Sequence, residues 1–424
     1  QPDVVAPGCD NGLAVLNPAL GQAYLAALQY LGTPTSPGFN ASQAALVQAN
    51  GFDMSPYGEG VLVGRGKDVT PKDDGQWGIA FRYMFEPLDT EFGAYFMNYH
   101  SRLPIFSGQA GPLTAYQAAG VAGPATGAAI LLNTCGPAAP TAAYAACAGA
   151  AAGAAQAAGT GVASAIAAGA GEYFIEYPED IRLYGLSFST TLPTGTAWQG
   201  EISYRDNAPV QLNTTDVLYS ALTPLDPTVS VLSATPGSTR HGFERKEITQ
   251  LQTTFTHFFD QVMGASRVTV VGEVGWTHVG GLEDTSVKRY GRDPIFGPGP
   301  LPNGRCESLN ASTLANTADK RNLSRYCEDD GFTTANSWGY RLRAVWDYPN
   351  AFLGVNLQPN LAWSHDVEGY SPGPGGNFEE DRKAVSVGLN ADYQNTYTMN
   401  LSYTDFFDGK YSTQDDRDFV ALSF

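Results

Sequence analysis

The chain has 424 residues, of which only 16% are charged, and its formal net charge is −18. This acidic balance argues against nucleic acid as a partner, because nucleic-acid binding needs basic patches. No run of about 18 consecutive apolar residues occurs, so the sequence predicts no transmembrane helix. The composition does not exclude a membrane protein, because a strand of a membrane barrel exposes only every second residue to lipid.

Residues 1–76 are predicted to form an irregular N-terminal loop or lid, because glycine and proline occur throughout this region. Residues 19–31 could form a short helix, since alanine, leucine and glutamine favour one. The chain begins at Gln1, without an initiator methionine or a signal peptide. We therefore expect the natural chain to continue upstream, where Cys9 would have its partner.

Residues 77–424 are predicted to form an all-β domain, because apolar residues alternate with small or polar ones in many stretches. A period of two is that of a strand with one apolar and one polar face. Near the C-terminus, for example, Val385, Val387 and Leu389 alternate with Ser386 and Gly388. The predicted strands cover residues 77–85, 92–102, 182–192, 196–207, 247–262, 267–279, 338–348, 351–365, 385–393, 397–404 and 419–424.

The last predicted strand ends on Phe424, with Val420 and Leu422 on the same face. This ending is typical of bacterial outer-membrane barrels, which close because lipid offers backbone groups no hydrogen-bond partner. The sequence therefore predicts an antiparallel transmembrane β-barrel of the bacterial outer membrane, with long, partly helical extracellular loops. A soluble β-domain that ends in a strand is the alternative. About eleven strands are predicted, and because single-chain bacterial barrels have even strand numbers, further strands are expected upstream.

Short turns alternate with long connections along the predicted barrel, as periplasmic turns alternate with extracellular loops. All long connections are therefore expected on one side of the sheet, outside the cell. They are residues 103–179, 207–246, 280–336 and 366–378.

The first long connection, residues 103–179, is an insertion whose middle, residues 136–171, is dominated by alanine and glycine. Alanine favours a helix and glycine opposes it, so broken helices rather than one rod are expected. The insertion could be a low-complexity surface element or a loop that folds over the barrel mouth and gates an apolar compound. The second interpretation is preferred, because a bond between Cys135 and Cys147 would staple the loop.

Four of the five cysteines form two closely spaced pairs in loop-like sequence. In an oxidising compartment these pairs would close as disulfides, Cys135–Cys147 and Cys306–Cys327. Metal binding is the weaker alternative, because the cysteines lack CxxC spacing and neighbouring histidines.

The sequence carries no recognisable catalytic constellation, and we expect neither an enzyme nor a cofactor or metal. The histidines lack metal-ligand spacing, and neither a GxSxG elbow nor a phosphate loop occurs. A barrel-borne phospholipase would need a Ser–His pair on the outer wall, and His257 with a nearby serine is the remaining candidate. The glycosylation sequons at Asn310 and Asn322 are interpreted as chance matches.

Charged residues on the polar face of the predicted strands are expected to line the lumen. They could form a mutually neutralising network of ion pairs that fills a wide lumen, or a charged lining beside a ligand path. Their charge alone does not name a ligand. The candidates are Arg82, Glu201, Arg205, Glu273, Arg341, Arg343, Arg382 and Asp392.

Several short motifs resemble one known family. The chain is similar to the proteobacterial outer-membrane family termed domain of unknown function thirteen-oh-two, which includes alkane-uptake proteins. The resemblance covers residues 70–102 and 180–424, and leaves the Ala/Gly-rich segment outside. The motifs are GFDMSP (51–56), DGQWG (74–78), TEFG (90–93), NYHSR (98–102), HDVEG (365–369), RKA (382–384), LSYT (401–404) and DRDF (416–419).

The resemblance implies an integral outer-membrane barrel, surrounded by lipid and lipopolysaccharide, that transports hydrophobic small molecules or lipids. It also implies a partner, either a periplasmic protein or a permease of the resistance-nodulation-division class. The family has no established functional residues, so none is transferred to this chain. A structural or adhesive barrel whose disulfide-stapled loops bind a partner is the alternative function.

Overall fold

The computed structural model describes residues 3–4, 12–15, 61–307 and 327–424. Cys9, the helix predicted at residues 19–31, the motif at 51–56 and both sequons lie outside these described residues. The described chain forms two sheets, one of six and one of eleven strands.

The six-stranded sheet draws three of its strands from the N-terminal region that was expected to be irregular. Its strand order is β1-β2-β3-β7-β6-β10, and β3 pairs with β7 in parallel. The strands are β1 (Asp3–Val4), β2 (Gly12–Val15), β3 (Val61–Arg65), β6 (Ile105–Gln109), β7 (Glu172–Glu176) and β10 (Thr239–Arg240).

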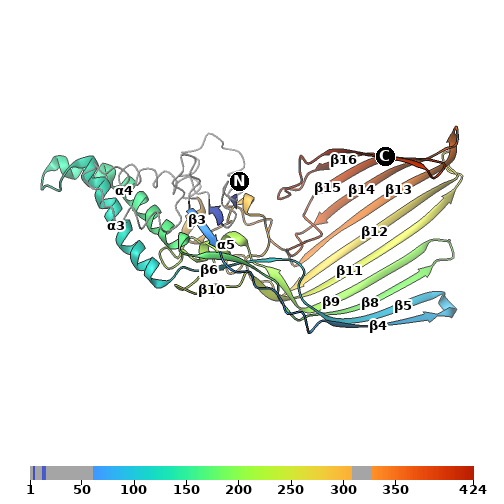
Figure 1. Cartoon of the computed structure of the whole chain (residues 1–424), viewed down its shortest axis with the longest axis horizontal. Helices are drawn as coiled ribbons and strands as arrows, with labels where there is room; N and C mark the ends of the chain where they lie inside the picture. The colour runs from blue at the N-terminus through green and yellow to red at the C-terminus, as the bar shows by residue number, and fades with distance from the viewer. Residues whose placement is uncertain (1–2, 5–11, 16–60, 308–326) are drawn as a thin grey trace.

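The larger sheet contains eleven strands, as predicted, and every neighbouring pair is antiparallel. Figure 1 shows these strands side by side, from β4 at one edge towards β16 near the other. They are β4 (Trp77–Phe85), β5 (Thr90–Tyr99), β8 (Ile181–Thr191), β9 (Ala197–Gln211), β11 (Phe243–Asp260), β12 (Arg267–Gly280), β13 (Asn336–Phe352), β14 (Val355–Glu368), β15 (Lys383–Tyr393), β16 (Tyr397–Phe407) and β17 (Phe419–Ser423).

The strand predictions differ from the structure mainly at the ends of strands. The turn predicted at Pro349 and Asn350 lies farther along the chain, at Leu353 and Gly354, where both residues have positive φ angles of 49° and 85°. Pro349 is accommodated within β13 because the register with β14 shifts between Tyr348 and Phe352. Proline lacks an N–H for the ladder, and such irregular pairing is where strands tolerate it.

The alternation in the sequence separates the two faces of the eleven-stranded sheet. Leu389 lies beside Leu401 of the next strand, whereas Asn390 lies beside Asn400. We name the face that carries Leu389 the outer face and the face that carries Asn390 the inner face.

The outer face is apolar and uncovered within the described chain. Every one of the eleven strands contributes at least one large apolar side chain that is exposed on this face. One such residue from each strand, in sheet order, is Phe81, Phe92, Leu186, Ile202, Leu251, Val274, Leu342, Leu361, Val387, Leu401 and Leu422. A contiguous apolar surface of this kind needs an apolar neighbour, because monomeric soluble proteins rarely expose one.

The sheet is open along two edges within the described residues. Strands β4 and β17 form these edges and do not pair with each other, so the described strands do not close the predicted barrel. Ten antiparallel pairings separate β4 from β17. The two edge strands therefore run in the same direction.

The connections at the two ends of the sheet differ in length, as predicted. At one end the strands are joined by short turns, such as residues 192–196 and 394–396. At the other end lie all the long connections, which Figure 1 shows gathered to one side of the strands. We name these long connections the cap, namely residues 100–180, 212–242, 281–307 with 327–335, 369–382 and 408–418.

The cap has its own apolar core, to which the cap ends of β9, β11 and β12 contribute. Helix α5 (Thr214–Ser220) packs there, and Asn213 caps this helix because its side chain accepts a hydrogen bond from the Asp216 N–H at 3.1 Å. The buried residues of this core are Ala208, Val210, Leu212, Val217, Leu232, Ile248, Val279 and Tyr290.

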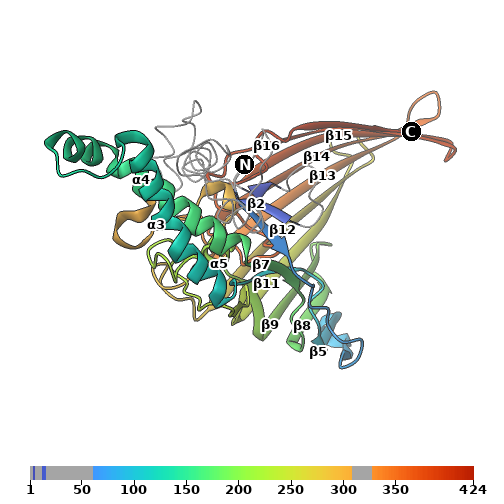
Figure 2. The same ribbon diagram turned by 60° about the vertical axis from the view of Figure 1, so that its left-hand side comes forward.

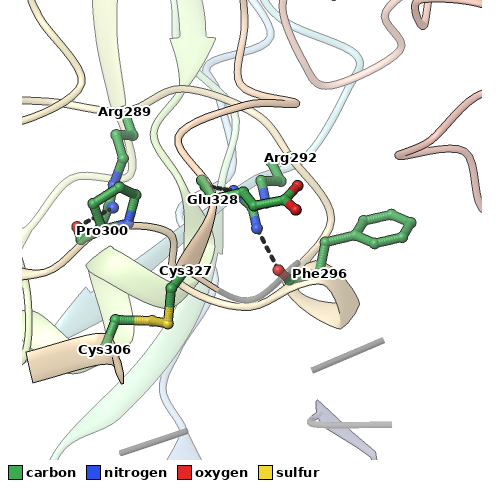
Figure 3. The surroundings of a disulfide bond; sticks show 7 residues. All are labelled: Arg289, Arg292, Phe296, Pro300, Cys306, Cys327 and Glu328. Atoms are coloured by element: carbon green, nitrogen blue, oxygen red, sulfur yellow. Dashed lines mark hydrogen bonds between the residues drawn. A yellow bond between two sulfur atoms is a disulfide. The ribbon is translucent and has the colours of Figure 1, made fainter. Parts of the chain in front are cut away.

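A buried ion pair fixes the cap loop that follows β12. Arg289 Nη2 lies 2.5 Å from Asp216 Oδ1, and the two side chains are 0% and 1% exposed. Arg289 also donates to the Pro300 carbonyl at 2.7 Å, beside the predicted Cys306–Cys327 disulfide, which is confirmed (Figure 3). The ion pair anchors this long connection to α5, and the disulfide joins two points within the connection itself.

The insertion at residues 103–179 folds as a helical hairpin between β6 and β7. Helices α3 (Leu113–Cys135) and α4 (Ala142–Gly169) have 23 and 28 residues, and the predicted Cys135–Cys147 disulfide joins them at the tip. Figures 1 and 2 show the hairpin extending away from the strands. By length and composition α3 could cross a membrane, although the sequence had predicted no such helix.

The glycines of the insertion do not break its helices, in contrast to our expectation. A Cβ atom on Gly159 would lie 2.6 Å from the Gly123 carbonyl oxygen, and one on Gly123 would lie 2.8 Å from that of Gly159. Glycine therefore permits α3 and α4 to pack backbone against backbone, and this tertiary packing outweighs its low helix propensity. Val162 and Ile166 of α4 are buried at the base of the hairpin.

Replacing Asp216 with alanine should destabilise the protein by about 3–5 kcal/mol, because Arg289 would be left buried without its counter-ion. Asp206→Ala is the control, since the Arg182–Asp206 pair has side chains that are 49% and 28% exposed; its loss should cost less than about 1 kcal/mol. Denaturant titration, followed by intrinsic fluorescence, measures both. Equal losses would contradict the structural role of the buried pair.

Acid should weaken the cap through Glu283. Burial alone would raise the pKa of this carboxyl, but hydrogen bonds from Lys246 and Tyr290 lower it from 4.5 to about 2. A carboxyl with a lowered pKa contributes stability that is fully present above its unfolded pKa and is lost as pH falls through its folded pKa. Stability should therefore decline between about pH 4.5 and pH 2, and Glu283→Gln should flatten this decline in denaturant titrations at several pH values.

Candidate functional site

A cavity on the inner face lies across β5, β8, β9, β11, β12 and β13, next to a cap loop. Its volume is about 650 Å³. Polar side chains dominate its lining, and Met97, Leu183 and Phe378 add apolar surface. The polar side chains are Tyr95, Ser187, Glu201, Ser203, Arg205, Gln250, Gln252, Glu273, Thr277, Arg341 and Asn377.

A second cavity of about 330 Å³ adjoins the first towards β15. Both cavities are lined by Glu273 and Arg341, and the second also by Arg343. The two cavities thus form a row along the inner face. Their shared boundary is formed by the Glu273 carboxylate and the Arg341 guanidinium group.

Five of the eight predicted lumen residues line this row, and three do not. Glu201, Arg205, Glu273, Arg341 and Arg343 line the cavities. The other three share the inner side of the sheet but lie elsewhere. Arg82 is on edge strand β4, Arg382 directly precedes β15, and Asp392 lies near the short-turn end of β15.

The polar side chains of the larger cavity are only partly paired. Arg205 Nη1 donates to Gln250 Oε1 at 2.7 Å, and Glu273 accepts from the Thr254 hydroxyl at 3.1 Å. The Nε atom of Arg205 is buried without a hydrogen-bond partner. A buried donor without a partner costs free energy, because it has lost its hydrogen bonds to water.

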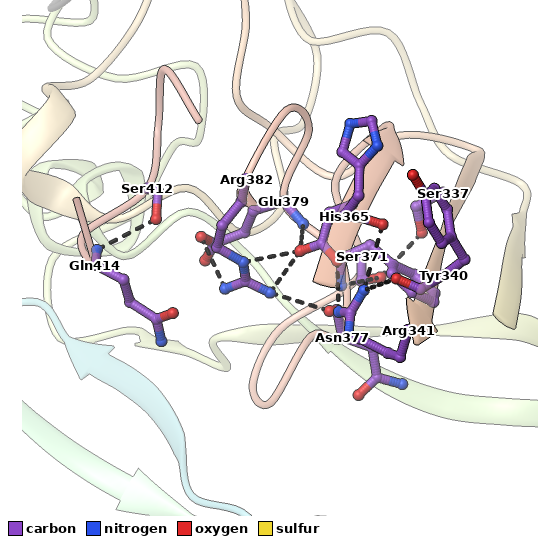
Figure 4. Close-up of polar contacts among 12 residues, drawn as sticks. Ser337, Tyr340, Arg341, His365, Ser371, Asn377, Glu379, Arg382, Ser412 and Gln414 are labelled. Atoms are coloured by element: carbon purple, nitrogen blue, oxygen red, sulfur yellow. Dashed lines mark hydrogen bonds and ion pairs between the residues drawn. The ribbon is translucent and has the colours of Figure 1, made fainter. Parts of the chain in front are cut away.

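The loop between β14 and β15 is fixed to the inner face by Asp366. This carboxylate, 1% exposed, lies 2.5 Å from Arg341 Nη2 and 2.7 Å from Arg382 Nη2. It also accepts a hydrogen bond from the Glu379 N–H at 3.1 Å. Figure 4 shows Arg341 of β13 and Arg382, which directly precedes β15, with Asn377 of the loop between their guanidinium groups.

Phe378 of this loop lies against the floor of the larger cavity. Its ring covers Gly275 and Gly339, which are partners on adjacent strands. A Cβ atom on Gly275 would lie 2.9 Å from the ring, and one on Gly339 would lie 3.0 Å from it. The Arg341 guanidinium lies 5.9 Å from the ring centre.

Sequence reasoning missed Asp366 and Phe378 because both were assigned to a loop. The alternation of β14 carried a signal for Asp366, since it follows Ala362 and Ser364 at the same spacing and pairs across the sheet with Gly339. No pattern in the sequence indicated that Phe378 would fold back onto the sheet.

The arrangement is suited to holding a ligand through hydrogen bonds and charge. Within residues 61–307 and 327–424 and the two N-terminal strands, no three His, Cys, Asp or Glu side chains converge as metal ligands. The candidate His257 contacts the hydroxyl of Thr196 at 2.8 Å, not that of a serine.

The fold and this site define a predominantly β protein with a polar cavity on one face of a large antiparallel sheet. The chain belongs to the family described as Protein of unknown function (DUF1302), whose sequence profile matches residues 1–424. This match confirms the resemblance and extends it over the insertion at residues 103–179. A comparison with curated proteins found no match.

Replacing Asp366 with asparagine should release the loop that carries Phe378. The substitution removes the charge from hydrogen bonds that are typically worth about 1.5–3 kcal/mol each when a charged group takes part. Amide hydrogen exchange in residues 369–382 should accelerate, whereas exchange in the centre of β12 should not change. Unchanged exchange in the loop would show that Asp366 does not fix it.

Proposed function

We propose that the eleven-stranded sheet is the larger part of an outer-membrane β-barrel. The exposed apolar outer face, to which every strand contributes, is the observation that carries this proposal. The aromatic residues Trp77 and Tyr397 lie near strand ends, where barrels place aromatic residues at the membrane surface. In this orientation the short turns face the periplasm, and the cap lies outside the cell.

Barrel closure then requires additional strands. Because β4 and β17 run in the same direction, pairing them directly would give a parallel contact in an otherwise antiparallel sheet. A second copy in the same membrane orientation would meet either edge in parallel as well. We therefore propose that an odd number of further amphipathic strands completes the ring, which satisfies the edge backbone groups that lipid cannot.

The two inner-face cavities support transport of a small hydrophobic molecule or lipid that carries a polar group. Phe378, Met97 and Leu183 offer contact to an apolar body, and the polar side chains of the lining, Arg205 among them, offer hydrogen-bond donors to an acceptor group. A periplasmic protein or a permease of the resistance-nodulation-division class, which the family resemblance implies, would meet the short-turn end. No hairpin residue lines either cavity, so transport under this proposal does not require α3 and α4 as a gate.

The helical hairpin supports the second candidate, a scaffold or adhesive barrel. Residues 103–171 contain no aspartate, glutamate, lysine, arginine or histidine, and the hairpin extends away from the sheet (Figure 2). Deleting its distal part, residues 128–154, separates the two candidates. Transport predicts unchanged uptake of hydrophobic carbon sources, whereas a scaffold function predicts lost surface contacts.

Leu389→Arg should impair membrane assembly by roughly 2–4 kcal/mol if its outer-face position lies near the bilayer midplane. Asn390→Arg is the matched control on the inner face of the same strand, and its effect should be much smaller. Folding into lipid vesicles, followed by heat modifiability on gels, measures both. Equal effects of the two substitutions would refute the lipid-facing assignment.

A further inference from the structure

We infer that Phe378 sets the size limit of the larger inner-face cavity. The inference rests on the proposed function in one respect, namely that this cavity takes a small molecule. The Phe378 side chain contributes no charge or hydrogen-bonding group to the cavity. It therefore acts on the cavity only through the space that its ring occupies.

The Phe378 ring packs in a position that is open only because the two residues beneath it are glycines. Gly275 and Gly339 lie side by side on β12 and β13, and the ring of Phe378 fills the place where their side chains would be. The two positions differ in one useful way. The three atoms nearest to a Cβ atom on Gly275 would all belong to the ring, whereas a Cβ atom on Gly339 would also lie 2.6 Å from the His365 carbonyl oxygen.

The ring is held in this position from the loop side as well. The Phe378 N–H donates to Ser371 Oγ at 3.1 Å, and the Phe378 carbonyl accepts from the Ser371 N–H at 2.9 Å. The Asp366 carboxylate anchors the same loop through Arg382. Only 8% of Phe378 is exposed, so the ring is a fixed wall and not a swinging lid.

The position of the Phe378 ring determines the size of ligand that the two cavities can hold. The larger cavity is lined by Phe378, and it joins the smaller cavity at Arg341, whose guanidinium lies over the ring. Removing the ring would therefore enlarge the cavity at the point where the two meet. A ligand with a bulkier apolar body should then enter.

Thiol labelling tests this inference without requiring a known ligand. Thr277 is 2% exposed and lines the larger cavity, so Thr277→Cys reports access, in a Cys9→Ser background that leaves the disulfide cysteines intact. A small methanethiosulfonate and a bulky fluorescein maleimide are applied to purified protein in detergent. The bulky reagent should label Thr277→Cys several-fold faster when Phe378→Ala is added, and the small reagent should gain much less.

Two further variants separate the size limit from general loosening. Gly275→Ala should displace the ring and so also accelerate bulky labelling. It should add nothing in a Phe378→Ala background, as expected for two changes that act on one contact. Asn390→Cys, on the inner face far from the loop, should label equally in all backgrounds. Because Gly275→Ala keeps the phenylalanine, it also provides the test if Phe378→Ala fails to fold.

Bulky labelling that is equally fast with and without the ring would overturn the inference. So would acceleration of Asn390→Cys by the same factor, because the ring would then affect folding and not access. Failure of the proposed function is recognised separately. If uptake assays show no transport while labelling still depends on Phe378, the transport proposal fails and the size limit remains.

Discussion

The register of the eleven-stranded sheet is the constraint on which the rest of the structure depends. Side chains alternate between faces with a period of two, so a slip of one residue in one strand would move its apolar residues to the polar side. The register shifts in this sheet lie at the cap end of β11, at the cap end of β13 and beside the turn at Leu353. The central parts of the strands keep their alternation, and the two faces therefore stay distinct across the whole sheet.

The inner face depends on this register for its chemistry. Glu273 and Arg341 can line a shared boundary between two cavities because they are direct partners on β12 and β13. Gly275 and Gly339 form the next inner-face pair along the same two strands. The charged pair and the glycine pair are thus successive positions of one ladder, and the cap loop adds Phe378 and Asn377 to what the ladder provides.

Much of the sheet could be predicted from the sequence, because its signal is local. Alternation identified all eleven strands of the larger sheet, and cysteine spacing identified both disulfides. The contacts that form the site are not local. Asp366 meets Arg341 and Arg382 only after three strands have paired, and the buried Arg289–Asp216 pair joins residues separated by 73 positions. The hairpin was misjudged because glycine was weighed by helix propensity, whereas close packing of α3 and α4 decides its effect.

The composition of the helical hairpin determines how trypsin cleaves the protein. Between Arg102 and Arg182 the sequence contains no lysine or arginine, so trypsin finds no cleavable bond anywhere in α3, α4 or the turn that joins them. The hairpin extends away from the sheet (Figure 1), yet trypsin-like proteases must leave it whole. Tryptic digestion will release it as one long fragment that contains the intact Cys135–Cys147 bond, and this disulfide will change the fragment's mass on reduction without dividing it.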